Sequence, residues 1–165
     1  MKLHLGCGPI IKEGYVNVDV EFYEGVNVIA DLEKDWPFES DSVDEIFAKD
    51  ILEHLPDIIH SMNEIWRVLK MGGTVEIYVP TTRGAAAFQD PTHKSWWNEN
   101  TFSYFASNEP GVRPVYRQIH CWFKIVEAKP YIYKGMPNAF GVYVKLEKVP
   151  LLSACLAKST QIETE

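Results

Sequence analysis

The opening stretch LHLGCGPIIKEGYVNVDV, residues 3–20, constrains the fold most, because it places two short strands on either side of one glycine turn. Apolar and polar residues alternate through Leu3–Leu5 and again through Tyr15–Val20, which is the period of a strand with one buried face. Only about nine residues separate the two strands. A parallel crossover normally needs a dozen residues or more, so no full helix is expected between them.

The same alternation continues along the chain. It predicts further strands at Val26–Ala30, Glu45–Ala48, Thr74–Val79, Phe123–Tyr133 and Ala139–Lys148. The segment VDVEFYEGVNVIAD could equally form an antiparallel hairpin, because a glycine-containing loop joins its two apolar runs.

One face of this sheet is expected to lack its usual helices, because fully covered parallel strands read as continuous apolar runs and these do not. The polar residues of the alternation should all project to that face: Lys2, His4, Asn17, Asn27 and Glu76. We expect the face to be solvated, covered by the segment after Pro80, or buried against a second copy of the chain.

One helix is clear from the apolar stripe at helical spacing between Pro56 and Leu69, and Gly72-Gly73 should end it. A shorter helix is expected at Asn98–Ala106. The predicted fold class is therefore α/β, a reduced Rossmann-like and mainly parallel sheet with an antiparallel C-terminal strand and helices depleted on one face.

Length and composition narrow the class of protein. The 165 residues fit a single domain over residues 1–150, with a long loop at 80–114 and a tail at 151–165. The net charge of −7 disfavours a nucleic-acid partner. No apolar run is long enough to span a membrane, and the N-terminus leads directly into a strand. Three cysteines without a CxxC pair fit a reducing setting, so a cytoplasmic location is expected.

The motifs follow one another in a specific order: LHLGCG, NVDV, IADLEKDWPFESDSVDEIFAKDILEHL and EIWRVLKMGGTVEIYVP. This order resembles the class I S-adenosylmethionine-dependent methyltransferases, above all small, type-11-like members whose core reads LGCG…GWVNVD…DL…PF…D…LEHL…E…RVLKPGG. The resemblance covers roughly Leu3 to Pro80, half of the chain. Each motif alone is weak, but the ordered set is quite specific.

The resemblance implies S-adenosyl-L-methionine as cofactor and a set of binding residues. The turn of Gly6, Cys7 and Gly8 would pass close to the methionine part of the cofactor. Asp19 would accept hydrogen bonds from the ribose hydroxyls, and Val20 next to it would also bind the cofactor. Asp31 and Leu32 would flank the adenine, and Asp50 would lie near the cofactor's amino group or the substrate. The chain departs from the family at His4, where an acid is usual, and at Ile11, where a third glycine is usual.

The residues themselves favour this cofactor over a dinucleotide. A pyrophosphate is held by free N–H groups at a helix N-terminus, and the short first connection leaves little room for that helix. S-adenosylmethionine has no phosphate and needs a close backbone approach, which glycine allows.

Two histidines are candidates for a catalytic base, which is needed only if an oxygen or nitrogen nucleophile must lose a proton. His93 in DPTHKSWW lies in the loop after the fifth strand, and His54 lies in LEHL. We expect no metal, because the pair His120-Cys121 has no second pair at ligand spacing.

The function predicted from the sequence is methyl transfer from S-adenosylmethionine to an unidentified acceptor, for which a small molecule is favoured. A catalytically silent cofactor-binding or regulatory protein of the same fold is the first alternative. A dinucleotide-binding oxidoreductase is the second. A homodimer is compatible with the polar sheet face.

Overall fold

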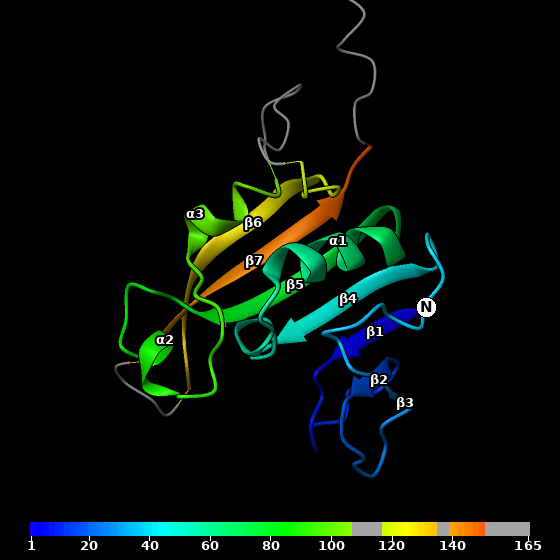
Figure 1. Ribbon diagram of the computed structural model, residues 1–165, viewed down its shortest axis with the longest axis horizontal. Helices are drawn as coiled ribbons and strands as arrows, with labels where there is room; N and C mark the ends of the chain where they lie inside the picture. Colours follow the sequence, from blue (N-terminus) through cyan, green and yellow to red (C-terminus); the bar gives the residue numbers. More distant parts are fainter. Residues whose placement is uncertain (107–116, 135–138, 151–165) are drawn as a thin grey trace, which may run out of the picture.

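The computed structural model describes residues 1–106, 117–134 and 139–150. Within them a single seven-stranded sheet has the order β3-β2-β1-β4-β5-β7-β6 (Figure 1). The strands are β1 (Lys2–Leu5), β2 (Val16–Asp19), β3 (Val28–Ile29), β4 (Val43–Lys49), β5 (Leu69–Pro80), β6 (Phe123–Ile132) and β7 (Phe140–Lys148).

The first five strands are parallel, and β7 runs antiparallel to both of its neighbours, β5 and β6. This arrangement confirms the predicted fold class. The hairpin alternative for the second and third strands is wrong, because Val18 of β2 pairs with Val28 of β3 in a parallel register. Loops rather than helices carry the chain back along the sheet at residues 6–15 and 20–27.

The helices of the described residues are η1 (Leu52–His54), α1 (Ile58–Val68), α2 (Ala86–Gln89) and α3 (Glu99–Phe102). Asp57 caps α1, since its side chain accepts a hydrogen bond from the His60 N–H at 2.8 Å. The expectation that Gly72-Gly73 ends this helix is wrong. Leu69 already lies in β5, where it is fully buried and pairs with Val43, so sheet pairing ends the helix before the glycines are reached.

The second predicted helix, Asn98–Ala106, is shorter than expected. Asn98 forms a capping box with Thr101 at the start of α3, but the helix ends at Phe102. Ala106 forms an isolated bridge with Phe123 of β6 instead, so the end of the predicted segment is extended against the sheet.

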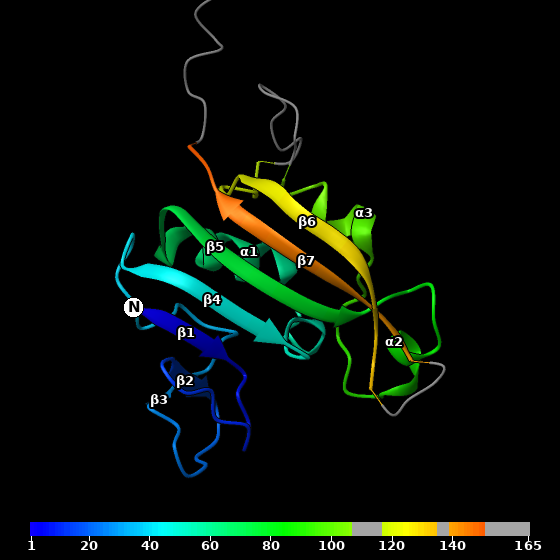
Figure 2. The ribbon, with the colours of Figure 1, turned by 180° about the vertical axis from the view of Figure 1, so that it is seen from behind.

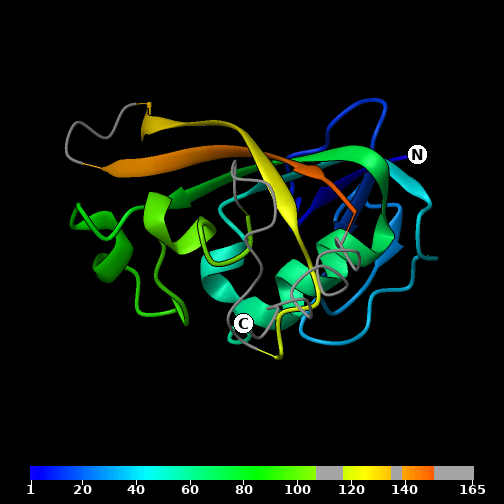
Figure 3. The same ribbon diagram turned by 90° about the horizontal axis from the view of Figure 1, so that it is seen from above.

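All described helices lie on the same side of the sheet, as the view along its edge shows (Figure 3). On that side the apolar residues of the central strands pack against the buried stripe of α1, which includes Met62 and Ile65. Seen from behind, no helix of the described residues crosses the strands (Figure 2). The prediction of a sheet with helices depleted on one face is therefore confirmed.

Two of the polar residues expected on the bare face are buried by a loop that the prediction did not consider. His4 and Asn17 are 5% and 3% exposed. The loop between β1 and β2 folds over them, and the Lys12 N–H donates to Asn17 Oδ1 at 2.9 Å. His4 Nδ1 lies 3.0 Å from the same Oδ1, and its ring meets the edge of Phe47. Burial lowers the pKa of His4, although the contact with Asn17 opposes this.

Elsewhere on this face, lysine side chains lie over aromatic rings. The Lys12 Nζ lies 4.4 Å from the Phe47 ring centroid, and the Lys129 Nζ lies 4.8 Å from that of Tyr143. Lysine stems are apolar, so they shield these rings from water in the place where another α/β protein would have a helix. No helix of the described residues is long and apolar enough to cross a membrane.

Candidate functional site

The turn after β1 is held in a conformation that favours glycine at two positions. Gly6 and Gly8 have φ angles of +58° and +51°, in the left-handed region. A Cβ at Gly6 would lie 2.5 Å from Ile51 Cγ1, whereas a Cβ at Gly8 would have no described atom within 4 Å. The turn is therefore tightly packed beneath Gly6 and open above Gly8. Cys7 is buried between them, and burial raises the pKa of its thiol.

Asp19, at the end of β2, fixes this turn from the neighbouring strand. Its Oδ2 accepts a hydrogen bond from the Gly8 N–H at 2.7 Å, and its Oδ1 accepts one from the Glu21 N–H at 3.0 Å. Each carboxylate oxygen can accept more than one hydrogen bond, so Asp19 keeps acceptor capacity for a ligand. The next residue, Val20, is 61% exposed.

A cavity of about 440 Å³ lies beside the ends of β2 and β3, and we call it the Asp31 cavity. It brings together four residues selected from the sequence: Val20, Asp31, Leu32 and His54. Its other lining residues are Ala30, Glu33, Ile51, Leu55, Thr92 and Lys94. Hydrogen bonds from Lys34 and from the Glu33 N–H lower the pKa of Asp31.

Ile51 connects the glycine turn to this cavity. Its side chain lies against Gly6 and also lines the cavity wall. The residues that line the cavity do not include Gly6, Cys7, Gly8 or Asp19. The glycine turn and Asp19 therefore lie next to the cavity and form no part of its wall.

A second cavity of about 280 Å³ shares His54 with the first, and we call it the Glu53 cavity. It brings Asp50, His54 and His93 together, as well as Tyr133 from the end of β6. Asp50 has a φ of +54°, which is uncommon for a residue other than glycine. Its carboxylate accepts a hydrogen bond from the Tyr133 hydroxyl at 2.6 Å and pairs with the Lys49 ammonium.

The two histidines meet in this cavity, with ring centroids 4.9 Å apart and their planes nearly perpendicular. His93 Nδ1 contacts the Ala87 carbonyl oxygen at 2.9 Å, and His54 Nδ1 contacts Thr92 Oγ1 at 3.1 Å. The sequence predicted both as candidates for one function, and the fold places them side by side.

Glu53 is the residue of this site that the sequence analysis missed. It is 2% exposed, and its Oε2 has no hydrogen-bond partner among the described residues. Burial, together with the nearby Asp50 carboxylate, raises the pKa of Glu53 to about 8. In the sequence it reads as an ordinary surface acid. The only signal was its position next to His54, between Leu52 and Leu55, both of which are buried.

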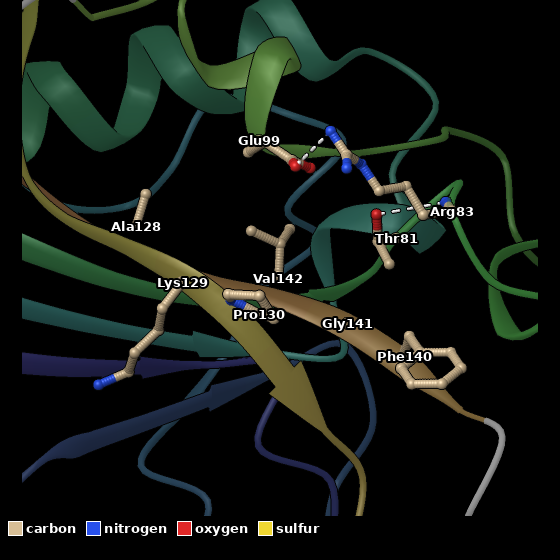
Figure 4. Close-up of a pocket in the computed structure, with 9 residues that line it drawn as sticks. All are labelled: Thr81, Arg83, Glu99, Ala128, Lys129, Pro130, Phe140, Gly141 and Val142. Atoms are coloured by element: carbon tan, nitrogen blue, oxygen red, sulfur yellow. Dashed lines mark hydrogen bonds and ion pairs between the residues drawn. The ribbon is translucent and has the colours of Figure 1, made fainter.

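A third cavity, of about 440 Å³, lies further along the sheet, and we call it the Val142 cavity (Figure 4). It is mostly apolar, and two of its lining residues, Arg83 and Glu99, form an ion pair at 2.6 Å. The Glu53 cavity and the Val142 cavity are lined by neighbouring residues of the chain. Pro80 and Ala139 line the first, and Thr81 and Phe140 line the second. The three cavities therefore follow one another around the carboxyl ends of the parallel strands, where open α/β sheets bind ligands.

Comparisons with known proteins agree with this geometry. The sequence model of a methyltransferase-domain family, Methyltransf_11, matches residues 11–77. No curated protein sequence matches the chain. Among solved structures, an S-adenosylmethionine-dependent methyltransferase from Archaeoglobus fulgidus is 15% identical with a TM-score of 0.63, covering 89% of this chain and 85% of that one.

Two further solved structures with this fold are a methyltransferase and a cyclase. The Burkholderia thailandensis 1,6-didemethyltoxoflavin-N1-methyltransferase, solved with 1,6-didemethyltoxoflavin and S-adenosylhomocysteine, is 13% identical with a TM-score of 0.62, covering 90% of this chain and 71% of that one. The [4+2]-cyclase SpnF is 12% identical with a TM-score of 0.62, covering 90% and 74%. The chain therefore matches the methyltransferase-domain family model over residues 11–77, and over most of its length it has the fold of S-adenosylmethionine-dependent methyltransferases.

Proposed function

We propose that the protein binds S-adenosylmethionine and transfers its methyl group to a small-molecule acceptor. The observation that carries the proposal is the pairing of the open glycine turn with the Asp19 carboxylate beside the Asp31 cavity. A nucleoside without phosphate needs a close backbone approach and an acceptor for its ribose hydroxyls, and these residues offer both.

Each part of the cofactor has residues suited to it. Gly6–Gly8 would lie along the methionine part and Asp19 would accept from the ribose, with Val20 beside it. Asp31 and Leu32 in the Asp31 cavity would flank the adenine. Asp50 would attract the cofactor's ammonium group. When bound, S-adenosylmethionine supplies a methyl group on a positively charged sulfur, already activated for displacement.

The residues of the protein would align the acceptor with the methyl group and remove the acceptor's proton. Alignment along the line of the breaking bond contributes most, because the leaving group needs no activation. His54 and His93 both line the Glu53 cavity, and one of them would take the proton from an oxygen or nitrogen acceptor. The apolar Val142 cavity next to it suits the body of a small acceptor, and the net charge of −7 does not suit nucleic acid.

The experiment is calorimetry with S-adenosylmethionine, S-adenosylhomocysteine and NAD on the wild type and two variants. We expect the first two to bind and NAD not to bind. Asp19→Asn should weaken binding by about 1–3 kcal/mol, because it removes a charged acceptor. Glu13→Gln, at an exposed acid of the loop before β2, is the control and should leave affinity unchanged. Binding of NAD alone would favour the oxidoreductase alternative.

The structure of a cyclase with this fold gives weight to a second candidate, a protein that binds the cofactor without transferring its methyl group. Incubation with methyl-labelled cofactor and a panel of small hydroxy, amino and carboxy compounds separates the two. Labelled product establishes transfer. Cofactor binding without product across the panel favours the silent alternative.

A further inference from the structure

The Glu53 cavity contains a group of three potential metal ligands, of which the proposed methyl transfer would use only one histidine, as a base. Glu53, His54 and His93 each offer one ligand atom, and these three atoms lie within 4.8 Å of one another. Two of the residues come from η1 and the segment after α2 supplies the third, so the group is assembled by the fold and not by neighbouring sequence.

Hydrogen bonding determines which nitrogen of each histidine is available. His93 Nδ1 lies 2.9 Å from the Ala87 carbonyl oxygen, which can only accept, so Nδ1 carries the proton. Thr92 Oγ1 lies 2.6 Å from Asp90 Oδ1 and donates its single proton there. The same Oγ1 must then accept from His54 Nδ1 at 3.1 Å. In the neutral form, each imidazole therefore has its lone pair on Nε2, as in a metal-binding histidine whose other nitrogen is held by a partner. His93 Nε2 also lies 4.0 Å from Asp90 Oδ2.

The buried side chain of Glu53 indicates that a ligand binds between it and the two histidines. This side chain is 2% exposed, and Oε2 has no hydrogen-bond partner among the described residues. A buried polar atom without a partner is costly, and native proteins rarely leave one unsatisfied. A carboxylate oxygen of Glu53 lies within 4.8 Å of a ring nitrogen of both His54 and His93, so a cation bound among the three side chains would give this buried carboxylate a partner.

We infer that Glu53, His54 and His93 form a binding site for one divalent transition-metal ion. Two imidazole nitrogens and one carboxylate oxygen suit zinc, iron or cobalt better than magnesium or calcium, which prefer oxygen ligands alone. Three protein ligands leave coordination positions open toward the cavity. An acceptor oxygen could bind the ion there and lose its proton more easily, a consequence that rests on the proposed methyl transfer. Metal binding by the three residues does not depend on the proposed methyl transfer.

The test uses untagged full-length protein and calorimetry with Zn²⁺ and Co²⁺ in the absence of S-adenosylmethionine. We expect one ion to bind per chain. Glu53→Gln, His54→Ala and His93→Ala should each lower the affinity about 10- to 100-fold or more. His120→Ala, an exposed histidine elsewhere, is the control and should bind as the wild type does. Circular dichroism establishes that each variant is folded.

The absorption spectrum of bound Co²⁺ gives a second measurement that does not depend on variants. Nitrogen and oxygen ligands give only d–d bands, whereas a thiolate from Cys7 or Cys121 would add a sulfur-to-metal charge-transfer band. No binding by the wild type, equal binding by the three variants and the control, or a charge-transfer band would each overturn the inference. Binding of S-adenosylhomocysteine, measured without metal, tests the proposed function separately.

Discussion

Among single residues, Gly6 and Gly8 share a left-handed backbone but differ in what surrounds them. Alanine at either position would bear about 1–2 kcal/mol of backbone strain. At Gly6 its methyl group would also collide with Ile51, so Gly6→Ala should destabilise the fold by more than this. At Gly8 the methyl group would enter open space where the cofactor is proposed to lie.

Urea unfolding and calorimetry on both variants check this difference. Gly8→Ala should remain folded and lose most of its affinity for S-adenosylhomocysteine, whereas Gly6→Ala should lose more stability. Unchanged affinity in a folded Gly8→Ala variant would mean that the cofactor does not approach this turn.

Asp50, just after β4, has both a strained backbone and a negative charge. Two substitutions distinguish the effect of the strain from the effect of the charge. Asparagine tolerates the left-handed region, so Asp50→Asn should keep stability close to that of the wild type. It removes the charge, however, and should weaken binding of a ligand with an ammonium group. Asp50→Ala should lose about 1 kcal/mol of stability as well. Thermal unfolding and calorimetry test this, and equal affinities for wild type and Asp50→Asn would argue against Asp50 as a ligand of the amino group.

At the level of elements, one buried acid, Glu64, links α1 to the loop before β4. Glu64 accepts hydrogen bonds from Arg67 and from the Trp36 N–H at 2.8 Å, and Arg67 donates in turn to the Trp36 and Phe38 carbonyl oxygens. Burial would raise the pKa of Glu64, but these hydrogen bonds outweigh it and hold the pKa below its ordinary value.

A lowered folded-state pKa stabilises the protein above the unfolded-state pKa of about 4.3, and this stabilisation disappears as the pH falls through the folded value. Glu64→Gln should therefore cost about 2 kcal/mol at neutral pH. The difference from the wild type should shrink below about pH 4. Urea unfolding at several pH values measures it. A difference that does not vary with pH would show that the charge of Glu64 contributes nothing.

The sequence predicted elements well where one local signal decided them and poorly where distant contacts did. The β6 and β7 strands and the apolar stripe of α1 have strong periodicity and are found as expected. The end of α1 was misplaced because the pairing of Leu69 with Val43 is invisible in local sequence. The burial of His4 and Asn17 was missed because it depends on how the loop at residues 9–15 folds back.

In the candidate site, too, the sequence predicted the residues that a local signal marks and missed those that depend on distant contacts. Residues at the ends of strands could be selected from sequence, because parallel strands bring their carboxyl ends to one edge. Glu53 was missed, since its position between Leu52 and Leu55 is a weak signal of burial and says nothing about the missing hydrogen-bond partner. The meeting of Tyr133 with Asp50 depends on β6 lying two strands away from β5, which no local pattern encodes.

Across the whole molecule, the sheet separates two surfaces of different character. The helices and the apolar core occupy one face (Figure 3). The other face is covered by a short loop and by lysine stems over aromatic rings. The three cavities follow the edge between these faces, from the Asp31 cavity through the Glu53 cavity to the Val142 cavity. This order suits a cofactor at one end and an acceptor at the other, with the histidines between them.

A crystal structure with S-adenosylhomocysteine tests this arrangement most directly. We predict that the ribose hydroxyls donate to Asp19, the adenine enters the Asp31 cavity against Leu32, and the amino-acid end lies along Gly6–Gly8. The sulfur should then face the Glu53 cavity. Ligand density in the Val142 cavity, or anywhere away from the glycine turn and Asp19, would contradict the proposed cofactor site and the function built on it.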